Sequence, residues 1–246
     1  LSLRRQRQMC IRDRNPDRAA VLADYLESEI RPAFEALGFT CRTLTHPKAL
    51  APFLYAERIE DPALPTVLGY GHGDVIRGLE KEWQEGLSPW ALTEAEGRWY
   101  GRGIADNKGQ HTINMEALRL VLETRGKLGF NAKYLIEMGE ETGSMGLREL
   151  CAEHRDMLAA DLLIASDGPR LAAKRPTIFL GARGSLNFDL SIEARAGGHH
   201  SGNWGGLISN PGIQLAHAIS TLVSPTGQIR ICLLYTSDAA DEGLGV

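Results

Sequence analysis

Hydrophobic residues recur at helical spacing in long segments and gather into short uninterrupted runs between them. The two longest helical patterns begin near residues 15 and 109, and each ends at a glycine, Gly38 and Gly126. Strands are predicted at 39–45, 51–59, 66–70, 133–138 and 161–165, the first two as a hairpin-like pair, and a further helix is expected at 145–158. Strands that alternate with helices predict an α/β fold, a sheet with helices on both faces.

The pattern changes after residue 183. Leu186, Phe188, Leu190 and Ile192 alternate with polar residues, which predicts a half-buried strand of an antiparallel sheet. A glycine-rich loop at 197–202 and a helix that begins at Asn210-Pro211 follow. We therefore expect a first domain at 15–182 and the start of a second, α+β domain at 183–231. Residues 76–98 have no clear period and are predicted to be a loop.

Both ends of the sequence are expected to be foreign to the protein. Codons can be chosen for residues 4–14 so that the reverse complement of their DNA encodes residues 232–242, residue for residue. That DNA looks like the transposase adapter used in preparing sequencing libraries. We therefore exclude residues 1–14 and 232–246 from reasoning about the fold, and interpret 15–231 as an internal fragment of a longer gene.

Setting these ends aside changes the charge argument. The formal net charge is −4, but the first fourteen residues carry +4 and the segment from Cys232 carries −3, which leaves −5 for 15–231. The basic N-terminus is therefore no evidence for a nucleic acid or membrane partner. Cys41 and Cys151 remain without paired spacing, and no apolar run reaches the ~18 residues of a transmembrane helix. We expect a cytoplasmic protein, with a signal peptide left open because the native N-terminus is missing.

Polar clusters follow four of the apolar or glycine-rich segments, and carry the candidate chemistry. They are His72 with Asp74, then Asp106, the pair Glu140-Glu141, and Asp167. Because catalytic groups of α/β enzymes gather at the carboxyl ends of strands, we expect these side chains to converge in one cleft. One histidine with several carboxylates suits zinc or manganese, and a free carboxylate can serve as general base. Taken singly, Gly-His-Gly is an ordinary turn and Glu140-Glu141 a solvated acidic turn; four clusters together favour a metal site.

The four motifs, in this order, resemble the signatures of the di-zinc aminopeptidase-like hydrolases, and within them the carnosinase, aminoacylase, acetylornithine deacetylase and succinyl-diaminopimelate desuccinylase group. The motifs lie at 71–75, 101–109, 140–144 and 166–168, and the resemblance covers nearly all of 15–231. It implies a catalytic domain with a central mixed sheet, followed by a lid or dimerisation domain. It also implies two zinc ions, with manganese or cobalt as alternatives.

The resemblance implies a role for each metal-binding position. His72 and Asp167 would bind the first metal ion, and Glu141 would bind the second. Asp106 would bridge both ions, and Asp74 would orient His72. The family's last ligand to the second ion is a histidine near the far C-terminus, which this sequence lacks.

The catalytic roles follow from the same resemblance. Glu140 would be the general base that takes a proton from a metal-bridged water. His200 matches a lid histidine that stabilises the oxyanion in a partner subunit's site. His199 is a second candidate for that role. The alternative is that His200 is an ordinary exposed loop histidine. Relatives also have a cis peptide where this chain has Asp106-Asn107.

The implied activity is hydrolysis of a peptide or amide bond in a small substrate, as in a dipeptidase or exopeptidase. An N-acyl amino acid deacylase is one alternative, and a non-catalytic binding relative is an alternative of another class. The intact set of metal and base residues favours an enzyme. The expected partners are a small peptide or N-acyl amino acid and, through the lid domain, a second copy of the chain; no nucleic acid and no membrane are expected. This chain by itself is expected to be inactive, unless His111, His199 or His217 completes the second metal site.

Overall fold

The computed structural model describes residues 19–168, 171–172, 174–181 and 188–231. The chain divides into two compact units after Leu171, and each is described by itself. The start of the first predicted helix, at 15–18, and the two expected foreign ends lie outside the described residues. Among the residues that the structure describes, no helix has the length and apolar character needed to span a membrane.

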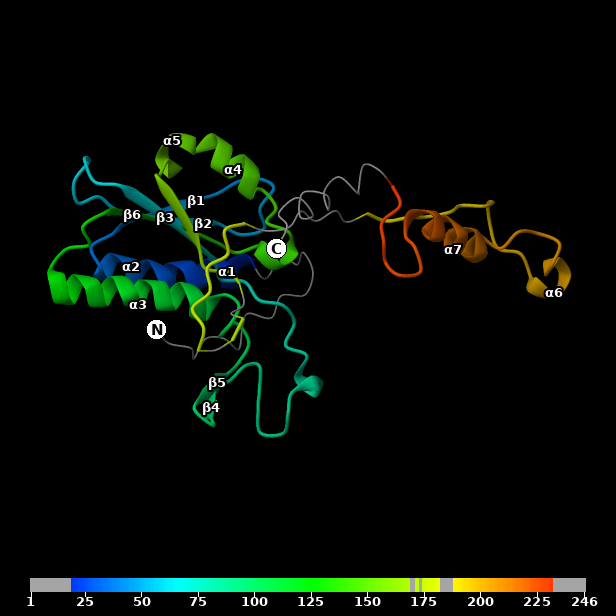
Figure 1. The fold of residues 1–246 in the computed structure, drawn as a ribbon, viewed down its shortest axis with the longest axis horizontal. Coiled ribbons are helices and arrows are strands. Elements are labelled where there is room, and N and C mark those ends of the chain that lie inside the picture. The colour runs from blue at the N-terminus through cyan, green and yellow to red at the C-terminus, as the bar shows by residue number, and fades with distance from the viewer. Residues whose placement is uncertain (1–18, 169–170, 173, 182–187, 232–246) are drawn as a thin grey trace. The chain divides into compact units, whose positions relative to one another are not determined.

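The first unit is built on a five-stranded mixed sheet with the strand order β1-β2-β6-β3-β7 (Figure 1). Its strands are β1 (Thr40–Leu44), β2 (Phe53–Arg58), β3 (Thr66–His72), β6 (Asn131–Glu137) and β7 (Leu162–Ala165). The β1-β2 and β2-β6 pairs are antiparallel, whereas β3 pairs in parallel with β6 and β7. Every strand end lies within two residues of its predicted position, and β1 and β2 form the expected hairpin-like pair.

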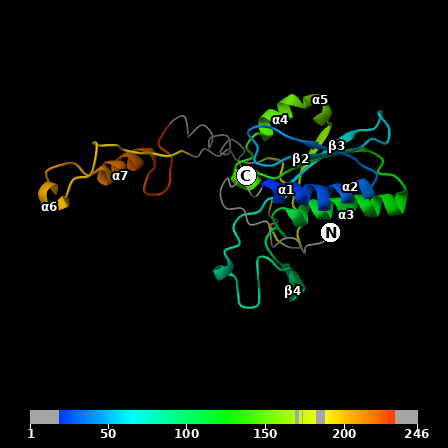
Figure 2. The same cartoon turned by 180° about the vertical axis from the view of Figure 1, so that it is seen from behind.

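Helices cover both faces of this sheet, as the alternating pattern predicts (Figures 1 and 2). One face carries α1 (Ala19–Tyr25), a π-helical turn (Leu26–Ile30), α2 (Arg31–Ala36) and α3 (Lys108–Arg125); the other carries α4 (Leu147–Glu153) and α5 (Arg155–Leu158). Successive strand residues point to opposite faces, so Leu54 and Ile136 join the larger core beneath α1–α3. Their neighbours Phe53 and Leu135 pack with Leu150 of α4 in a smaller core.

Two local predictions are wrong. The segment predicted as loop contains a short 3-10 turn (Glu80–Glu82) and the first strand of a hairpin made by β4 (Thr93–Ala95) and β5 (Arg98–Tyr100). In the second unit, residues 188–193 form no strand, because no described strand pairs with them to satisfy their backbone groups; 182–187 lie outside the described residues. The second unit does contain α6 (Ser201–Trp204) and the predicted helix, α7 (Pro211–Leu222). The Asn210 side chain caps α7 by accepting the Gly212 N–H at 2.8 Å.

Candidate metal centre

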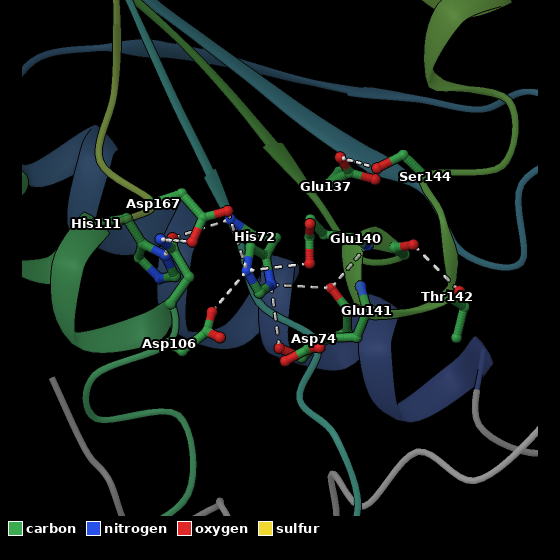
Figure 3. A network of polar contacts seen from close by, with 12 residues as sticks. His72, Asp74, Asp106, His111, Glu137, Glu140, Glu141, Thr142, Ser144 and Asp167 are labelled. Atoms are coloured by element: carbon green, nitrogen blue, oxygen red, sulfur yellow. Dashed lines mark hydrogen bonds and ion pairs between the residues drawn. The ribbon is translucent and has the colours of Figure 1, made fainter. Parts of the chain in front are cut away.

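Three parallel strands bring the candidate residues to one edge of the sheet. β6, β3 and β7 are neighbours and run in the same direction, so their carboxyl ends meet there. β3 ends at His72, the Glu140-Glu141 loop follows β6, and Asp167 follows β7. Asp106 lies in the loop just before α3. Figure 3 shows these side chains gathered around His72.

His72 is the centre of the cluster and is fully buried. Its Nε2 lies 3.0 Å from Asp106 Oδ1, 3.6 Å from Asp167 Oδ2 and 3.7 Å from Glu140 Oε2. One potential ligand atom from each of His72, Glu140 and Asp167 lies within 4.8 Å of the other two. An imidazole nitrogen among carboxylate oxygens is a donor set that zinc and manganese accept, so these residues fit a metal ion.

Asp74 connects two parts of the site. One carboxylate oxygen lies 3.2 Å from Nδ1 of His72, so Nε2 of the same ring is turned toward the other carboxylates. The carboxylate also accepts the backbone N–H groups of Glu140 at 3.2 Å and Glu141 at 3.0 Å. Asp74 is fully buried. It therefore holds His72 and the glutamate loop in a fixed relation, which goes beyond the orienting role expected for it.

The crowding of carboxylates determines the charge balance of the site. Burial lowers the pKa of His72, but the hydrogen bond and charge of Asp74, with the charges of Asp167 and Glu140, outweigh burial and raise the pKa to about 9. Burial and the neighbouring Asp106 raise the pKa of Glu141 to about 6. Burial also raises the pKa of Glu140, against the opposing charge of His72. This environment favours positive charge at the centre of the cluster.

Comparison with known proteins identifies the family of this chain. Residues 68–228 match peptidase family M20/M25/M40. The chain belongs to this family. It is 34% identical over 188 residues to Beta-Ala-His dipeptidase of Mus musculus, covering 76% of this chain and 38% of the mouse protein. It is 36% identical over 186 residues to the Cys-Gly metallodipeptidase dug1 of Schizosaccharomyces pombe, covering 74% and 39% of the two chains.

Solved structures confirm the fold of this M20 family chain. The crystal structure of human carnosine dipeptidase 1 matches with a TM-score of 0.68 and 27% identity, over 94% of this chain and 50% of that one. The M20 family metallo-carboxypeptidase Sso-CP2 of Sulfolobus solfataricus matches with a TM-score of 0.72 and 29% identity, over 92% and 50%. The chain thus spans well under half the length of the two curated relatives and half of these solved chains.

Asn107 is a residue of the candidate site whose role the sequence did not reveal. Its Oδ1 accepts the backbone N–H of His72 at 3.1 Å. Its Nδ2 donates to the carbonyl oxygen of Ser166 and, at 3.2 Å, to Oδ1 of Asp167. The side chain, fully buried, therefore connects β3 to the segment after β7. The peptide bond between Asp106 and Asn107 is cis, which confirms the expectation drawn from the resemblance.

Glu137 is a second residue whose role the sequence did not reveal, because it is a single acidic residue at the end of β6, directly after an apolar run. Its side chain is buried, and its Oε1 accepts hydrogen bonds from the hydroxyl groups of Tyr70 at 2.5 Å and Ser144 at 2.8 Å. Burial raises its pKa. Since Ser144 lies at the far end of the loop that carries Glu140 and Glu141, Glu137 anchors that loop to β3.

His200 lies in the second unit and is exposed. Its Nδ1 accepts the Gly202 N–H at 3.0 Å and so caps the start of α6. The ring of His199 contacts the ring of Trp204 edge-on, with 5.5 Å between centroids. These local contacts are compatible with either histidine in a lid role, which stays a prediction.

Proposed function

We propose that the full-length protein containing this chain is a di-zinc dipeptidase that hydrolyses the peptide bond of a small substrate beside a free carboxylate. The observation that carries this proposal is the gathering of His72, Asp106, Glu140 and Asp167 at one edge of the sheet, with Glu141 on the same loop. The names of two relatives, Beta-Ala-His dipeptidase and Cys-Gly metallodipeptidase, support a dipeptide as the substrate.

Each side chain has a proposed task. His72, Asp106 and Asp167 hold one zinc ion, and Asp106 and Glu141 contribute to the second, with manganese or cobalt as alternatives. When bound, the metal supplies a Lewis acid that polarises the scissile carbonyl and lowers the pKa of water. Glu140 accepts a proton from the attacking water and delivers it to the departing amine nitrogen.

We also propose how the chain divides. Residues 15–182 belong to the catalytic domain, and 183–231 are the start of a lid domain through which the full-length protein dimerises. His200 would then reach the partner's active site and stabilise the oxyanion. The segments 1–14 and 232–246 are adapter-derived in this proposal.

The full-length protein is expected to hydrolyse β-Ala-His or Cys-Gly only when metal is present. Dialysis against a chelator should abolish the release of free amino acids, and zinc, manganese or cobalt should restore it. An N-acetyl or N-succinyl amino acid of similar size is the matched control substrate. Preferential hydrolysis of that control would replace the dipeptidase with a deacylase, and hydrolysis of neither by the metal-loaded protein would favour a non-catalytic relative.

The 246-residue chain alone is expected to bind at most about one zinc ion tightly and to show no dipeptidase activity. In the proposed scheme its second ion has only Asp106 and Glu141, a weaker set than the usual three or four protein ligands. Zinc retained after competition with a chelator measures this directly. Two retained ions together with hydrolysis would require another ligand. His111 is poorly suited, because its two ring nitrogens contact Tyr25 and Asn107 rather than carboxylates of the site, and His199 and His217 stay as the other candidates.

A further inference from the structure

A chain of hydrogen bonds connects the first helix to the candidate metal centre. Tyr25, at the end of α1, places its hydroxyl oxygen 3.0 Å from Nε2 of His111 in α3. Nδ1 of His111 in turn lies 3.2 Å from Oδ1 of Asn107. Both His111 and Asn107 are fully buried. The path ends at the backbone N–H of His72 and the carboxylate of Asp167, which Asn107 contacts directly.

The directions of these hydrogen bonds follow from the groups at the metal end. The His72 N–H can only donate and the Ser166 carbonyl can only accept, so the oxygen of the Asn107 amide faces His72 and His111. Nδ1 of His111 must therefore donate to Asn107, and its Nε2 accepts the proton of the Tyr25 hydroxyl. The ring is fully buried and its two partners, Tyr25 and Asn107, are both uncharged, which favours the neutral imidazole that this pattern requires.

The backbone of β3 is packed directly onto this pair of side chains. A Cβ atom on Gly71 would lie 2.9 Å from Oδ1 of Asn107 and 2.9 Å from Cβ of His111. Contacts under 3.0 Å essentially never occur for real Cβ atoms, so only glycine allows the strand to approach this closely. Because His72 is the next residue, a shift of His111 or Asn107 is transmitted to the centre of the cluster.

We propose that His111 is a positioning residue for the metal centre. Its Nδ1–H fixes the Asn107 amide, and Asn107 fixes the backbone of His72 and the carboxylate of Asp167. Tyr25 keeps the proton of His111 on Nδ1, where the Asn107 oxygen needs it. This inference rests on the metal site of the proposed function, whereas the identity of the substrate does not affect it.

The test replaces His111 in the full-length protein and measures zinc affinity by chelator competition. His111→Leu removes the donor and is expected to weaken zinc binding by roughly 10–100-fold and to change the absorption spectrum of the cobalt-loaded protein. His111→Asn places an amide N–H near the position of Nδ1 and should recover most of the affinity. Tyr25→Phe keeps the aromatic ring, whose centroid lies 4.3 Å from Nζ of Lys108, but removes the hydroxyl. It should give an intermediate loss of zinc affinity.

Met115→Leu is the matched control, since Met115 is buried on α3 one turn beyond His111 but belongs to the apolar core. It should leave zinc affinity and the cobalt spectrum unchanged. Wild-type affinity and spectrum in His111→Leu, or equal losses in His111→Leu and His111→Asn, would overturn the proposal. A wild-type protein that binds zinc yet hydrolyses no dipeptide would refute only the proposed dipeptidase activity. The ratio of zinc affinities between His111→Leu and wild type would still test the role of His111.

Discussion

Replacing Glu140 with glutamine in the full-length protein is expected to lower kcat by roughly 10²–10⁴-fold while zinc content stays the same. Glutamine keeps the size of the side chain and the backbone N–H that Asp74 accepts, but its amide cannot take up a proton from water. Burial raises the pKa of Glu140 and Asp167 adds to this effect, which brings the carboxylate closer to the pKa of a base that works near neutral pH. Steady-state kinetics at saturating zinc, with the metal counted in the same samples, measures both quantities.

Glu141→Gln is the natural control, because the two glutamates share one loop and both backbone N–H groups bind Asp74. It is expected to weaken the second zinc ion, and activity should recover when excess zinc is added. The structure makes this comparison informative, since Glu140 lies 3.7 Å from His72 and belongs to the compact group of ligand atoms with Asp167. If Glu140→Gln lost zinc and Glu141→Gln kept zinc but lost turnover, the two roles would be exchanged.

Strands of the first unit's sheet were predictable where a short apolar run is bounded by polar residues, glycine or proline. β3 is the clearest case, since its run ends in Gly-His-Gly and the strand stops at His72. The β4-β5 hairpin was not predictable in the same way, because its strands are three residues long and contain no buried residue. Its turn carries Glu96 and Gly97 at φ of 54° and 69°, so pairing and turn geometry rather than burial form it.

The residues at 188–193 illustrate the opposite error. Alternation of Phe188, Leu190 and Ile192 with polar residues indicates a face suited to burial, but a strand also needs a neighbour for its backbone N–H and C=O groups. That neighbour is a non-local property, and no pattern within the segment encodes it. In the structure, residues 188–193 therefore form no strand, although their apolar and polar side chains alternate.

The candidate site was likewise predictable only in part. His72 and Asp167 could be found because each lies just after an apolar run, where the topology of an α/β sheet brings side chains together. Asn107 and His111 act through hydrogen bonds to groups far away in sequence, such as the bond between Asn107 and the His72 N–H, 35 residues apart. Asparagine and histidine are common residue types at the start of a helix, so only the folded structure reveals which groups they position.

Gly109→Ala tests whether the loop that carries Asp106 is held as tightly as the structure indicates. Gly109 is the second residue of α3, and its N–H donates to the carbonyl of Gly103 at 3.0 Å. A Cβ atom at this position would lie 1.8 Å from the carbonyl oxygen of Ile104 and 2.9 Å from its carbon. Both are backbone atoms, so no side-chain rotation can relieve the overlap and the loop itself must move.

Two effects of the Gly109→Ala substitution oppose each other. Helix propensity favours alanine over glycine by about 1 kcal/mol, whereas overpacking of this kind costs about 1–3 kcal/mol and occasionally more. An overlap of this depth with backbone belongs at the upper end, so we expect the free energy of unfolding to fall and zinc affinity to fall with it as Asp106 is displaced. Gly198→Ala is the control, because no heavy atom lies within 4 Å of its added Cβ. Urea denaturation measures the free energy of unfolding, and chelator competition measures the zinc affinity. A raised unfolding midpoint with full zinc affinity would contradict the prediction. It would mean that the gain in helix propensity exceeds the cost of overpacking, and that the loop moves without displacing Asp106.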